Sequence, residues 1–215
     1  MTAAYTLTLI SSYFIGGIPF ALIIGKSQGV DIREHGSGNV GATNVGRVCG
    51  KKWGIIAFIC DSTKGFLPVF TVNYLYTFDN PQLAMILAAI GAYLGHVFTP
   101  YLKFKGGKGV ATAAGALLAL SPIPTAIAFV SWAICLACSK MISLSSIVAA
   151  AVLPLVAFIL LMQKAQGMSY AVFALLFCLG MLTIYRHKSN IKRILAGEEP
   201  RIGEKKEKLN ENSSS

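Results

Sequence analysis

Charged residues are scarce in this chain, and their absence excludes an ordinary soluble domain. They make up 13% of the 215 residues, whereas about 25% is usual in soluble globular proteins. Hydrophobic residues account for 54%, and they gather in runs of near-membrane length that short basic loops separate. The short alternating segments of a membrane β-barrel are missing. The sequence therefore predicts an all-α, polytopic helical membrane protein.

Several other signatures are missing. The net charge of +10 sits in loops without interleaved aromatic residues, which excludes a nucleic-acid partner. The first apolar run, residues 3–24, follows no basic segment and has no small-residue cleavage site, so we expect a retained helix. The pair Cys135-x-x-Cys138 lies in an apolar run without histidine or a second pair. We therefore predict no disulfide and no metal site.

Seven apolar segments are visible, and the fourth is short for a span of about 20 residues. The stretch Ser121-Pro122-Ile123-Pro124 that follows it is typical of a tight turn. If the fourth and fifth segments formed one buried hairpin, the count would drop to five or six. The seven segments are 4–24, 54–76, 83–101, 109–121, 123–139, 142–162 and 168–185.

The basic residues predict the orientation of the chain in the membrane. The loops on the opposite side hold only Lys164, and the basic-rich side of a membrane protein is cytoplasmic. We therefore expect the N-terminus outside and the C-terminus in the cytoplasm. Residues 1–202 are expected to form one transmembrane domain, and the polar residues 203–215 a disordered cytoplasmic tail. The basic-rich side holds Lys26, Arg33, Arg47, Lys51, Lys52, Lys103, Lys105, Lys108, Lys140 and the cluster from Arg186 onward.

The first loop whose residues predict a functional site spans residues 36–47. Glycines let the backbone approach a ligand closely, and successive N–H groups then bind an anion. Arg47 adds a planar fork that suits a phosphate. A flexible linker would favour serine and glycine without paired asparagines and an arginine. The candidate residues of this loop are Ser37, Gly38, Asn39, Gly41, Asn44 and Arg47.

The second loop spans residues 103–112 and directly precedes a predicted helix. Its backbone donors and the helix N-terminus are therefore expected to point the same way, toward a phosphate. It does not align with a Walker A motif, so we expect no NTPase. The alternative is a basic anchor for anionic lipids. The candidates here are Lys105, Gly106, Gly107, Lys108 and Gly109.

A third group of polar residues follows the last apolar segment. His187 and Asn190 are spaced to share a helix face, and neither helps to set topology. For His187 a structural role is as well supported as a catalytic one. Within the spans, Asp61 and Lys64 are expected to pair. His96 either faces the site or caps its helix.

These segments together resemble the bacterial membrane acyl-phosphate:glycerol-3-phosphate acyltransferases over nearly the whole chain. The resemblance implies a seven-helix enzyme of the inner membrane with a cytoplasmic active site. It would make lysophosphatidic acid from glycerol 3-phosphate, as the first step of phospholipid synthesis, with acyl phosphate as donor and no cofactor. The matching blocks are Ser37-Gly38-Asn39-x-Gly41-Ala42-Thr43-Asn44-x-x-Arg47, Asp61-x-x-Lys64-Gly65, Gly95-His96-x-Phe98 with 104–112, and Arg186-His187 with Asn190-Ile191-x-Arg193 and Gly197-x-Glu199.

The resemblance also implies roles for individual residues. Ser37, Arg47, His187 and Asn190 would be catalytic, and the loop from Lys105 to Gly109 would bind glycerol 3-phosphate. Ser143 is expected to border the site. The chemistry agrees, because both substrates carry phosphate and the loops are rich in anion donors. Phosphate is a good leaving group, so we expect neither a metal nor a covalent intermediate. The resemblance implies nothing about the oligomeric state.

Three rival functions fit less well. A transporter of an organic phosphate would place its site near the membrane midplane and often show internal repeats, and neither is visible. A purely structural or lipid-binding protein leaves the glycine loops unexplained. A soluble-type acyltransferase would need a His-x-x-x-x-Asp pair. His35, His96 and His187 are each followed five residues later by a residue other than aspartate.

Overall fold

The computed structural model describes residues 2–75 and 78–203, and every regular element within these ranges is a helix. The all-helical prediction is confirmed. The predicted tail lies outside the described residues apart from Gly203. The elements are α1 (Thr2–Gly17), α2 (Phe20–Ser27), α3 (Ala42–Val48), α4 (Lys51–Leu75), α5 (Pro81–Val97), the 3-10 helix η1 (Pro100–Leu102), α6 (Val110–Leu120), α7 (Pro122–Ser139), α8 (Ile142–Met162), α9 (Tyr170–Arg186) and α10 (Lys188–Leu195).

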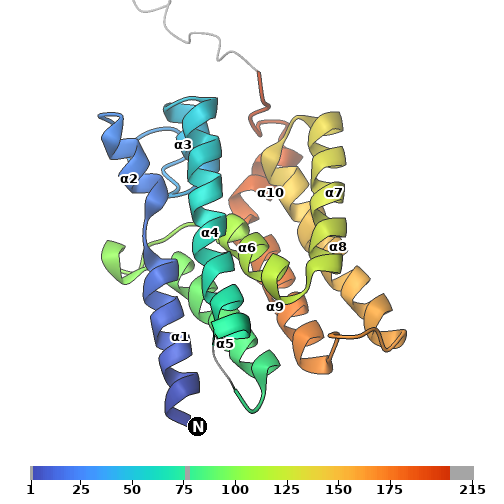
Figure 1. Cartoon of the computed structure of the whole chain (residues 1–215). Coiled ribbons are helices and arrows are strands. Elements are labelled where there is room, and N and C mark those ends of the chain that lie inside the picture. Colours follow the sequence, from blue (N-terminus) through green and yellow to red (C-terminus); the bar gives the residue numbers. More distant parts are fainter. Residues whose placement is uncertain (1, 76–77, 204–215) are drawn as a thin grey trace, which may run out of the picture.

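The long helices run up and down a single bundle (Figure 1). Helix α1 lies along α5, and α4 packs against both α5 and α6. Helix α7 pairs with α8, which also contacts α9. Figure 1 shows the chain beginning at one end of the bundle, with α2 and α3 at the other. This alternation places the predicted basic loop between residues 26 and 52 opposite the N-terminus.

Each of the seven predicted apolar segments contains a helix within the described residues, but the helices differ in length. Within the part of the chain that the structure describes, five spans are long and apolar enough to cross a membrane: α1 with α2, α4, α5 with η1, α7 and α8. Helices α9 and α10 pass the same test only as a pair bent by 55°. Helix α6 has only 11 residues, which agrees with its short apolar segment. The count of seven spans and the orientation of the termini stay predictions.

The boundary between α6 and α7 differs from the predicted turn. Helix α6 ends at Leu120 and α7 begins at Pro122, so Ser121 alone separates them. Pro122 and Pro124 belong to the first turn of α7 rather than to a loop. Proline is tolerated there because the first N–H groups of a helix have no partner within it.

The first apolar segment is one candidate span, as predicted, but it consists of two helices. Helix α1 ends at Gly17 and α2 begins at Phe20. Pro19 lies between them and has no N–H to continue the hydrogen-bond ladder. The carbonyl of Gly17 accepts a hydrogen bond from the Thr99 hydroxyl at 2.6 Å, and that of Ile18 accepts one from Lys64 Nζ at 2.6 Å.

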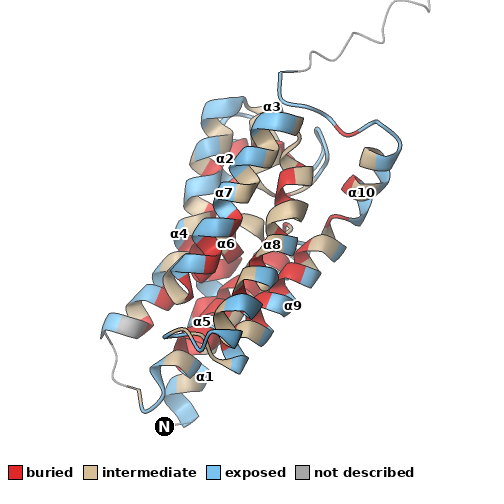
Figure 2. Ribbon diagram, turned by 90° about the vertical axis from the view of Figure 1, so that its right-hand side faces the viewer, coloured by how far each residue is buried: buried red, intermediate tan, exposed pale blue. Residues whose placement is uncertain are grey.

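Two groups of buried apolar residues form the core. The larger lies among α4 to α9, and the smaller joins α2, the following loop, α3 and α4. Figure 2 shows buried residues on the inward faces of the helices and exposed residues on the outer surface. Gly115 lets α6 approach α4 closely, because a Cβ there would lie 1.9 Å from the carbonyl oxygen of Ser62. This close contact places the N-terminus of the short α6 inside the bundle.

Candidate active site

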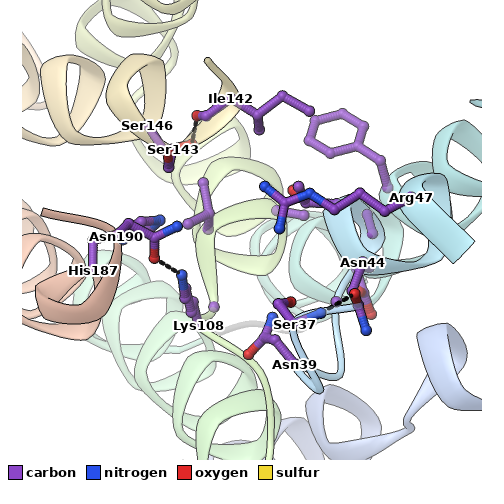
Figure 3. A pocket seen from close by; sticks show the side chains of 18 of the residues that line it. Ser37, Asn39, Asn44, Arg47, Lys108, Ile142, Ser143, Ser146, His187 and Asn190 are labelled. Atoms are coloured by element: carbon purple, nitrogen blue, oxygen red, sulfur yellow. Dashed lines mark hydrogen bonds between the residues drawn. The ribbon is translucent and has the colours of Figure 1, made fainter. Parts of the chain in front are cut away.

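A cavity of about 320 Å³ opens where the N-termini of α6, α8 and α10 meet the loop before α3. Figure 3 shows Arg47 reaching in from the side of α3, with Lys108 and Asn190 across the cavity from it. Unpaired N–H groups at a helix N-terminus attract anions. The polar lining residues are Ser37, Asn39, Thr43, Asn44, Arg47, Asp61, His96, Lys108, Ser143, Ser146, His187, Ser189, Asn190 and Arg193.

Asn44 organises the first loop. Its Oδ1 accepts a hydrogen bond from the backbone N–H of Ser37 at 2.9 Å. Its amide nitrogen donates to the carbonyls of Ile32 at 2.7 Å and His35 at 3.1 Å. The amide thus has partners within the loop, although Asn44 borders the cavity. The loop is closed around this buried side chain, and Ser37 and Arg47 line the cavity on either side of it.

The second loop differs from the prediction that its glycine N–H groups face a phosphate. The N–H groups of Gly106 and Gly107 donate to the carbonyls of Val97 at 3.1 Å and His96 at 3.2 Å, at the end of α5. Both glycines lie outside the cavity, and Lys105 is exposed. A Cβ on Gly107 would lie 2.3 Å from His96 Nε2. These two glycines therefore permit close packing of the loop on α5.

Lys108 and Gly109 are the part of the second loop that reaches the cavity. Gly109 has a φ of 84° and caps α6, so the chain turns there into the helix. The first-turn residues Val110 and Ala111 also line the cavity. The N–H groups that open α6 have no partner within the helix. They are the backbone donors of this loop that lie at the cavity.

His187 and Asn190 lie on the same wall of the cavity, at the junction of α9 and α10. His187 Nδ1 lies 2.8 Å from the carbonyl oxygen of Thr183. Because a carbonyl oxygen only accepts, Nδ1 carries the proton and Nε2 is an acceptor in the neutral ring. Burial and the nearby Lys108 charge lower the pKa of His187 to about 4. The ring is therefore neutral near pH 7.

Glu199 joins the two sides of the site, and sequence reasoning did not place it there. Its Oε1 accepts hydrogen bonds from Ser143 Oγ at 2.7 Å and Asn190 Nδ2 at 2.8 Å, and its Oε2 accepts one from Arg193 Nε at 2.7 Å. Arg47 lies 3.5 Å away. The signal in the sequence was a carboxylate after a glycine within a strongly basic segment.

The charges of the site are mostly positive. Burial alone would raise the pKa of Glu199, but its hydrogen bonds from Ser143, Asn190 and Arg193 outweigh that and lower it. Burial lowers the pKa of Lys108 to about 8, against the attraction of Glu199 and with the repulsion of nearby arginines. Lys108 donates to Asn190 Oδ1, so Asn190 connects this lysine to Glu199. The arrangement suits an anionic ligand.

The cavity also has apolar lining residues. Phe58 of α4, Val110 and Ala111 of α6, Trp132 of α7 and Ile142 of α8 line it. Trp132 Nε1 donates to Ser146 Oγ at 3.3 Å, which holds the indole against α8. A ligand with a charged head and a hydrocarbon part therefore meets suitable surroundings at both ends.

A family model described as "Glycerol-3-phosphate acyltransferase" matches residues 6–197. The chain belongs to the glycerol-3-phosphate acyltransferase family. It is 42% identical over 189 residues to the enzyme of that name from Desulfotalea psychrophila, covering 87% of this chain and 93% of the relative. It is 43% identical over 197 residues to that from Endomicrobium trichonymphae, covering 91% and 94%.

The fold of this acyltransferase also resembles solved structures. It matches the glycerol 3-phosphate form of PlsY, an integral membrane glycerol 3-phosphate acyltransferase, with a TM-score of 0.83 and 38% identity. That match covers 93% of this chain and 96% of the other. The lysophosphatidic acid form matches with a TM-score of 0.80 and 37% identity, over 93% and 95%. The prediction of a multi-pass membrane protein is thereby confirmed.

The acyltransferase brings most of its predicted site residues together. Eleven line the cavity: Ser37, Gly38, Asn39, Gly41, Asn44, Arg47, Lys108, Gly109, Ser143, His187 and Asn190. Lys105, Gly106 and Gly107 do not. His96 and Asp61, whose positions the sequence left open, also border the cavity, and Asp61 pairs with Lys64 at 2.8 Å as predicted. The roles of these residues stay predictions.

Proposed function

We propose that this acyltransferase moves a fatty acyl group from acyl phosphate to the 1-hydroxyl of glycerol 3-phosphate. The products are lysophosphatidic acid and inorganic phosphate. The observation that carries this proposal is one cavity that is lined by Arg47, Lys108 and the N-terminus of α6 together with apolar side chains. Two phosphates need several cationic and N–H donors, whereas the acyl chain needs apolar surroundings.

The proposed reaction is direct attack. The hydroxyl oxygen of glycerol 3-phosphate forms a bond with the acyl carbonyl carbon, and the bond from that carbon to the phosphate oxygen breaks. The electron pair leaves with the phosphate, which also takes the hydroxyl proton. Ser37 and Arg47 would hold the donor phosphate, and the Arg47 fork would stabilise the negative charge that develops on it. Positioning then supplies most of the acceleration.

Lys108 and the first turn of α6 would hold the phosphate of glycerol 3-phosphate. His187 would orient the acceptor, because the Nε2 of its neutral ring accepts a hydrogen bond from the attacking hydroxyl. Asn190 supports this arrangement, since it accepts from Lys108 and donates to Glu199. The described residues hold no group of three or more histidine, cysteine, aspartate or glutamate side chains that suits a metal. The proposed steps involve no metal ion.

We further propose that residues 1–202 act as one transmembrane domain in the bacterial inner membrane. The charge asymmetry between loops supports a cytoplasmic active site and an external N-terminus. Soluble glycerol 3-phosphate would then reach the cavity from the cytoplasm. The acyl chain would lie on the side of Phe58 and Trp132.

The purified protein tests this function with glycerol 3-phosphate and one donor at a time. We expect lysophosphatidic acid and an equal amount of phosphate from acyl phosphate, and little product from acyl-CoA or acyl carrier protein. An Arg47→Ala variant is the matched control for contaminating activity. Equal use of acyl-CoA and acyl phosphate would contradict the donor assignment. No product from any of the three would contradict the proposed reaction.

A further inference from the structure

The break in the first membrane helix is held by two side chains from other parts of the bundle. Lys64 Nζ of α4 donates to the carbonyl of Ile18 at 2.6 Å, and the Thr99 hydroxyl, after α5, donates to that of Gly17 at 2.6 Å. Lys64 and Thr99 are both buried. We call residues 17–20 the elbow. The elbow is thus tied to two neighbouring elements at once.

A broken helix within a membrane needs such donors. The last carbonyls of a helix have no partner within it, and membrane lipid offers none. A lone buried lysine would itself be costly, and Asp61 compensates its charge at 2.8 Å with a side chain only 2% exposed. The ion pair therefore makes a strong donor available where water is scarce. Asp61 and Lys64 contribute no atom to the proposed bond-making steps.

The elbow sets the direction of α2, and α2 carries the first loop of the site. Ala21 and Leu22 of α2 belong to the smaller core, together with Ile32 and Val40 of the loop. A Cβ on Gly25 would lie 2.5 Å from Ile32 Cγ2, so helix and loop are in close contact. A change in the angle at the elbow would therefore move the loop that bears Ser37 and leads into Arg47.

We propose that Lys64 and Thr99 are positioning residues, which hold the elbow so that the first loop presents Ser37 and Arg47 to the donor phosphate. This inference rests on the proposed function, in which those two residues bind acyl phosphate. Loosening the elbow then weakens the binding of the donor more than that of glycerol 3-phosphate. The acceptor's ligands are Lys108 before α6, the first turn of α6 and the junction of α9 and α10, none of which belongs to α2 or to the first loop.

Two sets of variants test the positioning of the loop. Thr99→Val removes the donor to Gly17 while keeping the shape of the side chain, and Thr99→Ser is the matched control that keeps the hydroxyl. The double variant Asp61→Asn with Lys64→Met removes both buried charges together, so neither is left unpaired. Each is measured for the KM of both substrates, for kcat, for thermal stability and for hydrogen exchange of residues 18–41 and 110–120.

We expect Thr99→Val to raise the KM for acyl phosphate about fivefold, as the loss of one hydrogen bond does, with that for glycerol 3-phosphate nearly unchanged. Exchange should become faster in residues 18–41 but not in 110–120, and Thr99→Ser should behave like the wild type. The double variant should show the same pattern, more strongly.

Two results would overturn the proposal. One is unchanged exchange in residues 18–41 together with unchanged KM values in Thr99→Val and in the double variant. The other is an equal rise of both KM values with faster exchange in both segments, which indicates general loosening. If the wild type failed to use acyl phosphate, the proposed function would fall, whereas the exchange data would still report on the elbow.

Discussion

Replacement of His187 tests whether this ring orients the acceptor or removes its proton. In the structure Nδ1 donates to the carbonyl of Thr183, and Nε2 remains as an acceptor at the cavity. A glutamine places its amide oxygen close to the former position of Nε2. An asparagine keeps mainly the group near Nδ1, and an alanine keeps neither. If Nε2 only orients the hydroxyl, we expect activity to fall in the order glutamine, asparagine, alanine.

The size of the loss separates the two roles of His187. A neutral hydrogen bond contributes about 0.5–1.5 kcal/mol, and 1.36 kcal/mol corresponds to about tenfold in rate. An orienting histidine therefore predicts a loss of about tenfold in kcat/KM for His187→Ala. A general base contributes about 10²–10⁴-fold. The two expectations are far enough apart for steady-state assays with acyl phosphate and glycerol 3-phosphate to distinguish them.

The pH dependence gives a second measurement on the same variants. The pKa of His187 is lowered to about 4 by burial and by Lys108, so the ring stays neutral from pH 5.5 to 8 and adds no limb to the profile there. Because the unfolded ring has a pKa of about 6.5, the unfolded state binds a proton first as the pH falls. Stability should therefore decrease between about pH 6.5 and 4, and less so in His187→Gln.

One combination of results would refute this reasoning. All three variants would lose activity equally, by 10²-fold or more as expected for a missing base. The wild-type profile would also show an acid limb between pH 5 and 7 that disappears with the histidine. His187 would then be the general base, and the leaving phosphate would not be the proton acceptor.

The remaining predictions concern four other residues. Arg47→Ala should lower kcat/KM by about 10²–10³-fold in protein that still inserts, and Arg47→Lys should also be poor, since a point charge does not reproduce the fork; near-normal turnover would remove Arg47 from the site. Gly107→Ala should lower the thermal midpoint and impair both KM values, because its Cβ would lie 2.3 Å from His96 Nε2; an effect on glycerol 3-phosphate alone would instead support a phosphate contact. Glu199→Gln should cost about 1.5–3 kcal/mol of stability, measured by thermal unfolding, since Arg193 loses its charged partner; unchanged stability would show that the charge is dispensable. A membrane-impermeant thiol reagent should reach Cys49 only from the cytoplasmic side, and labelling from outside intact cells would reverse the proposed orientation.

The first loop shows how much of the site can be predicted from local sequence. Glycines, paired asparagines and Arg47 within twelve residues predicted an anion-binding loop, and the structure places Ser37 and Arg47 at the cavity. The sequence did not distinguish a residue that contacts the ligand from one that stabilises the loop. Asn44 was assigned to substrate binding, yet its amide closes the loop on Ile32, His35 and Ser37. Which of two asparagines is buried depends on how the loop folds back, and local composition does not contain that.

The amino-acid sequence by itself determined the helical membrane fold, the break near Ser121 and the segments that meet at the site. These features depend on the length of apolar runs, on proline and on loop charge, all of which are local. Only the tertiary structure decided the position of Glu199, the packing of Gly106 and Gly107 on α5, and the elbow at Pro19. Each of these depends on which distant group supplies a hydrogen-bond partner. A buried carbonyl or carboxylate must find such a partner, and helix packing alone determines whether it is Lys64, Thr99 or Asn190.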